Sequence, residues 1–92
     1  MGIEYDMQEI KDEFWVLKEL EWSKETVKKL LELAKKCQAV IKHIKNAGNN
    51  RSVITKRYFH ACKQELNSLK QQIMDYRLKM QLALDLEASY KK

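Results

Sequence analysis

Residues 52–90 read SVITKRYFHACKQELNSLKQQIMDYRLKMQLALDLEASY, without a proline or a glycine. Apolar residues recur there in alternating steps of three and four, which is the period of a helix packed along a seam against another helix. Only Glu87 interrupts the repeat. One continuous helix of this length would extend roughly 60 Å, so the stretch predicts an elongated, coiled-coil-like protein. The seam residues are Phe59, Cys62, Leu66, Leu69, Ile73, Tyr76, Met80, Ala83 and Tyr90.

The bulk composition predicts an all-α chain. Its 92 residues are 45% apolar and 34% charged, without proline, which is typical of long helices with charged outer faces. We therefore expect one helical domain over residues 1–92. No apolar run approaches the roughly 18 residues that span a membrane, and acids stand where a secretory signal carries basic residues. We expect a cytoplasmic chain with no transmembrane segment.

Two breaks divide the chain into three helices. The first is the segment around Gly48, where asparagines favour a turn over residues 47–51. The second lies near residues 20–24, where the apolar phase slips and Ser23 can cap a new helix, with Trp22 and Val27 placed as a hydrophobic staple. We predict helices over residues 3–21, 24–46 and 52–90. Their apolar seams are Ile3, Met7, Ile10, Phe14 and Leu17, then Val27, Leu30, Ala34, Cys37, Ile41 and Ile44.

Two arrangements of these helices fit the pattern. In the first, which we favour, residues 3–46 form one arm of a long antiparallel hairpin kinked near Ser23. Residues paired across the turn then keep a nearly constant sum of numbers, so Leu17 would face Ala83. In the second, residues 3–21 fold back and complete a three-helix bundle. Both place Cys37 and Cys62 on facing seams, as buried thiols or as a disulfide under oxidising conditions.

The second half of the long helix is too apolar for one seam. Leucines at spacing four form an additional ridge, and two tryptophans lie seven apart and off the main stripe. A helix apolar over so wide an arc packs against two neighbours. The ridge either closes a three-helix core or joins two copies as a helical bundle. We expect a non-enzymatic protein–protein interaction or regulatory module, a homodimer or a subunit of a helical assembly. The expected partner-binding residues are Trp15, Trp22, Leu78, Leu82 and Leu86.

Charge is distributed unevenly along the chain. Residues 35–72 contain nine basic residues and one acid, net +8, whereas residues 1–34 carry nine acids and five lysines, net −4. Such a basic region attracts phosphate backbones or other acidic surfaces. Binding of nucleic acid or an acidic surface is therefore the alternative function. The basic patch is predicted at Lys35, Lys36, Lys42, Lys45, Arg51, Lys56, Arg57 and Lys63.

The sequence offers no recognisable catalytic or metal-binding constellation. It lacks a Glu-x-x-His pair, a nucleophile beside a histidine and a phosphate-cradling glycine loop. His43 and His60 are out of helical phase with the two cysteines, which argues against a zinc site. We expect no catalytic residue, no metal and no cofactor.

Overall fold

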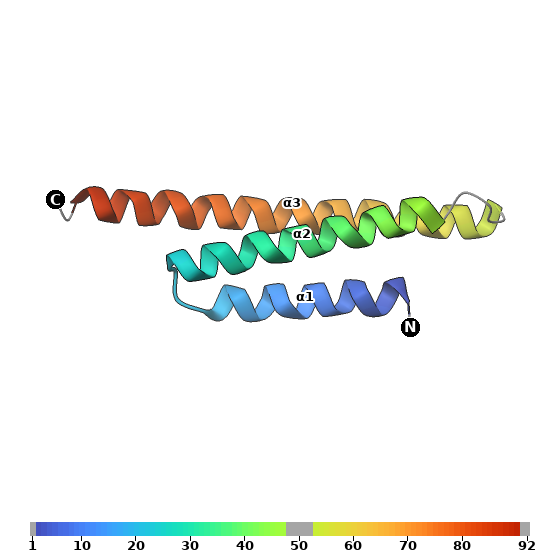
Figure 1. Cartoon of the computed structure of the whole chain (residues 1–92), viewed down its shortest axis with the longest axis horizontal. Coiled ribbons are helices and arrows are strands. Elements are labelled where there is room, and N and C mark those ends of the chain that lie inside the picture. Colours follow the sequence, from blue (N-terminus) through green and yellow to red (C-terminus); the bar gives the residue numbers. More distant parts are fainter. Residues whose placement is uncertain (1, 48–52, 91–92) are drawn as a thin grey trace.

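Three helices account for the fold. The structure is a computed structural model that describes residues 2–47 and 53–90, apart from the side chains of residues 47 and 53–55. Helix α1 spans Ile3–Glu19, α2 spans Lys24–Ala47 and α3 spans Val53–Tyr90. Successive helices run in opposite directions along a body of 59 × 18 × 14 Å (Figure 1). The predicted all-α class is confirmed.

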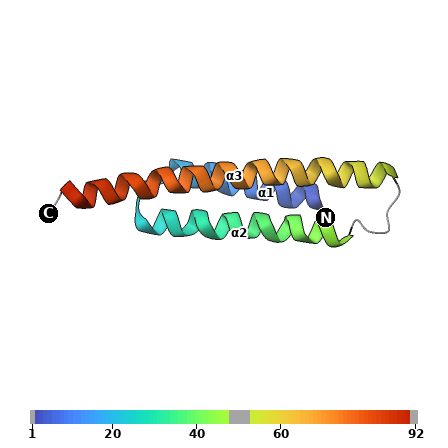
Figure 2. The ribbon, with the colours of Figure 1, turned by 90° about the horizontal axis from the view of Figure 1, so that it is seen from above.

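The three-helix arrangement is the one the chain adopts, because α1 folds back along α2 instead of continuing its axis (Figures 1 and 2). The chain leaves α1 at Leu20, whose backbone is extended (φ −78°, ψ 156°). Ser23 then caps α2, since its hydroxyl accepts from the Thr26 amide at 3.2 Å. The Thr26 hydroxyl also donates to the Glu21 carbonyl at 2.9 Å. These bonds start a new helix at Lys24, and the kinked long hairpin that we favoured is not formed.

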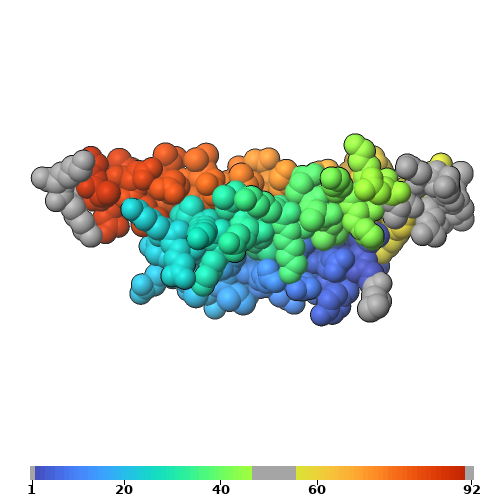
Figure 3. Space-filling model, viewed as in Figure 1, coloured from blue at the N-terminus to red at the C-terminus, as the bar shows by residue number. Residues whose placement is uncertain are grey.

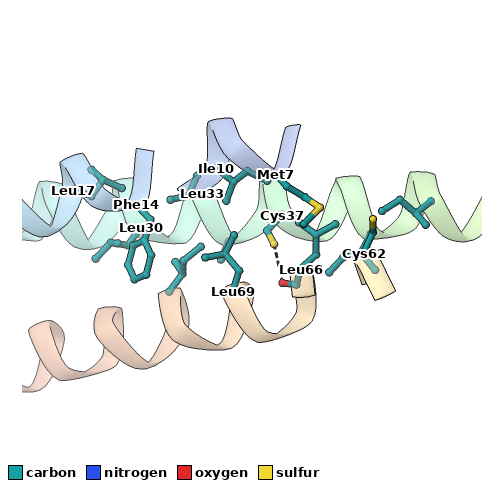
Figure 4. Packing of buried hydrophobic residues seen from close by; sticks show 14 of the residues in the cluster. Met7, Ile10, Phe14, Leu17, Leu30, Leu33, Cys37, Cys62, Leu66 and Leu69 are labelled. Carbon is teal, nitrogen blue, oxygen red and sulfur yellow. Dashed lines mark hydrogen bonds between the residues drawn. The ribbon is translucent and has the colours of Figure 1, made fainter. Parts of the chain in front are cut away.

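The hydrophobic core lies along the line where the three helices meet (Figure 4). The predicted seam residues of α1 and α2 are buried, with Ile3 partly buried. Helix α2 also buries a second line at spacing seven, formed by Thr26 and Leu33 and continued by the partly buried Val40. A helix with two apolar lines has two neighbours. From α3 the core receives Cys62, Leu66, Leu69, Ile73 and Met80.

Both cysteines are buried free thiols. The Cys37 thiol donates to the Leu66 carbonyl at 3.1 Å (dashed line in Figure 4), so Cys37 lies level with Leu66 and not directly across from Cys62. The predicted register of α2 and α3 was therefore wrong by about one turn. A shift of four residues keeps the same helix face toward the partner, so the apolar pattern alone cannot fix the register. Burial raises the pKa of the Cys37 thiol, which favours its neutral form.

Three ion pairs among the described residues join α1 to the other two helices. The Lys36 ammonium on α2 bonds the carboxylates of Glu9 at 2.7 Å and Glu13 at 2.9 Å, both on α1. The pKa of Lys36 is raised, first by its hydrogen bond to Glu9 and then by that to Glu13. On the other side of α1, Lys11 pairs with Glu65 of α3 at 2.6 Å. These side chains are 40% exposed or more, so each pair contributes only about 0.2 to 1 kcal/mol.

Candidate interaction surface

The face of α3 that points away from the core carries a line of exposed leucines, which we call the outer ridge: Leu78, Leu82 and Leu86. Their side chains are 55%, 55% and 62% exposed, whereas Met80, between the first two in sequence, is completely buried. The four-residue spacing turns each leucine only slightly relative to the one before, so the three share one side of the helix. Helix α3 is thus apolar on two opposite faces, and only one of them is covered.

The outer ridge continues onto a part of α3 that projects beyond the other helices. Residues 81–90, which we call the α3 extension, run past the end of α1 and the start of α2 (Figures 1, 2 and 3). No residue after Met80 is buried in the described part of the chain. Ala83 is half-buried, but Tyr90 is 88% exposed, so its predicted seam position is wrong. Leu84 still packs against the edge of the core, but from residue 85 onward every described side chain of α3 is exposed.

Trp22 lies at the corner between α1 and α2 and is engaged with α3. Its indole N–H donates to the Tyr76 hydroxyl at 3.1 Å, and the two rings meet edge to face at 5.9 Å. The Tyr76 hydroxyl in turn donates to the Lys18 carbonyl at 3.3 Å. Tyr76 also meets the Phe14 ring edge to face. Trp22, although 42% exposed, therefore helps to fix the corner of the bundle as well as offering surface.

Trp15 lies on α1, apart from the leucines in sequence and on another helix. It is 65% exposed and borders a shallow groove of about 400 Å³ between α1 and α3, beside Ser68 and Gln72. The five residues predicted to bind a partner thus come from three places: the outer ridge on α3, the corner at Trp22 and the outer side of α1. Val16, 58% exposed on α1, is a further apolar residue that the sequence pattern did not single out.

The predicted basic patch is only partly assembled. Lys42 and Lys45 near the end of α2, and Lys56 and Arg57 near the start of α3, are exposed at the same end of the molecule because these helices are antiparallel. Lys35 is also exposed and Lys63 is half-buried. Lys36 is already paired with two acids. Arg51 lies outside the described residues.

Tyr58 couples the same end of α3 to α1. Its hydrogen bond to the Glu4 carboxylate is the main reason why its pKa is raised from 10.0 to about 12, with burial and Cys62 as further causes. A phenol that donates to a carboxylate gives up its proton less readily, because ionisation would place two anions side by side. This interaction links the start of α3 to α1 near the basic patch and adds no cation to the patch.

A further concave surface lies between α1 and α2. This groove has a volume of about 550 Å³, is open and is lined in part by the apolar side chains of Val16, Leu17 and Leu33. Its rim carries acids and lysines, of which Lys36 already binds Glu9 and Glu13. Within residues 2–47 and 53–90, no three side chains of the metal-ligating types come together. The groove therefore carries no chemical assignment.

Comparison with known proteins assigns no family. Neither the models of protein families nor the curated proteins nor the solved structures give a significant match. No helix in the described ranges is long and apolar enough to cross a membrane. The functional argument therefore rests on the exposed surfaces of this chain.

Proposed function

We propose that this protein is a non-enzymatic helical interaction module that self-associates through the outer ridge of α3. The observation that supports the proposal is the ridge itself: three large leucines, each more than half exposed, on the face opposite the core. A contiguous exposed apolar surface on a small protein commonly marks an interaction site. A second helix laid along the ridge would remove these side chains from water.

The expected strength of this association follows from the burial. Complete burial of a leucine contributes about 1.5 to 3 kcal/mol, and six leucines in a pair of ridges are each a little over half exposed. Their burial therefore contributes about 5 to 10 kcal/mol. The lost freedom of the two chains costs about 4 to 15 kcal/mol. Because the two ranges overlap, the ridge leucines by themselves account for at most a weak dimer, which dissociates on dilution.

Sedimentation equilibrium over a concentration series tests the proposal. Leu82→Asp places a charge in the centre of the ridge and is expected to leave the protein monomeric at every concentration. Gln64→Asp is the matched control, because this substitution adds the same charge. Gln64 is exposed on the same side of α3 as Leu82, but in the part of the helix that lies alongside α1 and α2. Circular dichroism checks that both variants stay helical. A dimer that survives in Leu82→Asp would contradict the proposal.

Trp15→Ala tests separately whether α1 contributes to the dimer interface. The exposed indole of Trp15 is the largest apolar side chain that the fold leaves on α1, and aromatic side chains are favoured anchors at interfaces. We expect the variant to dimerise more weakly than the parent while it remains helical. Unchanged dimerisation would restrict the interaction surface to α3.

The second candidate function is binding of a polyanion through the basic end, and the antiparallel packing of α2 and α3 supports it by placing exposed cations side by side. Filter binding to a mixed pool of DNA and RNA at low salt would detect it. A triple variant with glutamine in place of Lys42, Lys45 and Lys56 is expected to bind the pool more weakly, and its binding should depend less on salt concentration. The same changes at Lys24, Lys28 and Lys29, also exposed but at the other end of α2, are the matched control. Equal losses in both triple variants would argue against a localised site.

A further inference from the structure

We infer that the second copy binds the outer ridge in the antiparallel direction, with Leu82 of both copies at the two-fold axis. The inference rests on the proposed self-association and specifies its geometry. The partner is a second copy of this chain, because the exposed apolar and polar positions on this face of α3 are spaced symmetrically about Leu82.

The symmetry is visible in the spacing. Leu78 and Leu86 lie four residues before and after Leu82, so reversal of the second helix sets Leu78 of each copy opposite Leu86 of the other. Asp75 and Ser89 are each seven residues from Leu82 and are both exposed. Seven residues are two helical turns, so both residues lie on the face of the ridge and close it at its two ends.

The polar ends of the face distinguish the two possible directions. In an antiparallel pair the Asp75 carboxylate meets the Ser89 hydroxyl, which can donate a hydrogen bond to it. Asp75 already accepts from Gln71 at 2.8 Å through one of its oxygens, and its other oxygen is not used by that bond. In a parallel pair Asp75 would face Asp75 of the second copy, and like charges directly opposite each other are destabilising.

Net charge favours the same direction. The segment 74–90 has three acids and two basic residues, net −1, whereas residues 35–72 have a net charge of +8. A parallel pair would set the two strongly basic regions beside each other. An antiparallel pair joins two nearly neutral segments and places the basic regions at opposite ends of an assembly built from bodies 59 Å long. Charges so far apart are screened at physiological salt.

The projection of α3 provides the space for this pairing. The α3 extension stands clear of α1 and α2 in both perpendicular views (Figures 1 and 2). Two such extensions can overlap with their three-helix bodies on opposite sides of the axis. Each extension, which runs past α1 and α2 of its own chain, then gains a neighbouring helix from the other copy.

Single cysteines on the ridge test the geometry by disulfide formation. Helix axes roughly 8 to 10 Å apart leave facing Cα atoms roughly 3.5 to 5.5 Å apart, which overlaps the range that a disulfide spans. We expect Leu82→Cys to cross-link with itself on mild oxidation. Leu78→Cys and Leu86→Cys alone should not, because eight residues separate equivalent positions by about 12 Å along the axis. A mixture of these two variants should cross-link.

Controls separate this inference from the proposed function. The parent chain measures background from Cys37 and Cys62, which are buried. Sedimentation equilibrium of each variant under reducing conditions reports whether it dimerises at all. A dimer in which all three single variants cross-link with themselves is parallel, and a dimer in which none cross-links meets elsewhere; both outcomes overturn the inference. A reduced parent chain that stays monomeric overturns the proposed self-association itself.

Discussion

Helix α3 has two parts that look alike in sequence and differ in their surroundings. Between Cys62 and Met80 its inner face is buried against α1 and α2, with Leu66, Ile73 and Met80 completely inaccessible to solvent. In the α3 extension, residues 81–90, no side chain is buried, although three of its ten residues are leucines, against three of the nineteen residues from Cys62 to Met80. The apolar repeat crosses the boundary between them and is interrupted only at Glu87.

The difference shows that an apolar pattern indicates where a helix can pack but does not identify its neighbour. The boundary is set by α1 and α2, which end and begin at the corner where Trp22 contacts Tyr76. Beyond that corner the last turns of α3 continue with little tertiary packing, and packing of an apolar face supplies most of the stability of helices in proteins. An intermolecular partner would supply the packing that the fold does not.

The largest expected effect comes from one substitution made in both parts of the comparison. Leu66→Ala removes a fully buried side chain and is expected to lower the free energy of unfolding by about 2 to 5 kcal/mol. Leu82→Ala removes a side chain that is 55% exposed, and we expect less than about 0.5 kcal/mol in the monomer. Urea unfolding at a concentration where the protein is monomeric measures both. Similar losses would mean that the ridge is covered within one chain.

Amide hydrogen exchange sharpens the same contrast residue by residue. In the monomer we expect amides of residues 66–80 to open only with global unfolding, and those of residues 81–90 to exchange through local fraying. Raising the protein concentration should slow exchange in the α3 extension while leaving exchange in the middle of α2 unchanged. Uniform slowing along the chain would indicate a general gain in stability. No slowing would place the interface elsewhere.

Much of the fold could be predicted from sequence because local signals were strong. The slip in apolar phase and Ser23 located the break between α1 and α2, and the seam residues of both helices are buried. The direction of α1 was not predicted correctly, because the long hairpin and the bundle use the same seam. Leu33 was the missed signal. Leu33 stands seven residues after Thr26 and seven before Val40. These three residues form the second line of α2, and Leu33 on this line lies beside Leu17 of α1.

The candidate site was predictable in part. The spacing of Leu78, Leu82 and Leu86 showed from sequence that α3 is apolar on a second face, and the structure leaves that face exposed. The role of Trp22 was not predicted, because Trp22 lies off the apolar seam. Its contact with Tyr76, 54 residues along the chain, fixes the corner at which α1 folds back. The pairing of Lys36 with Glu9 and Glu13 depends on the same fold-back, so its removal from the basic patch was equally hidden.

The smallest expected effect concerns the opposite end of α3, where Tyr58 bonds Glu4. The pKa of Tyr58 is raised from 10.0 to about 12, so the protonated hydroxyl is the form that stabilises the fold. That contribution is complete below pH 10 and is lost as the pH rises toward 12. Tyr58→Phe should therefore be less stable than the parent at neutral pH, and the difference should shrink across this range. Glu4→Gln should show the same loss of pH dependence, because the Glu4 carboxylate is the first cause of the raised pKa of Tyr58.

Urea unfolding followed by circular dichroism at a series of pH values measures the difference in the free energy of unfolding between parent and variant. The titration of Cys37 is common to all three chains and cancels in this difference. A gap between parent and Tyr58→Phe that stays constant with pH would show that the hydrogen bond to Glu4 does not hold the start of α3 against α1.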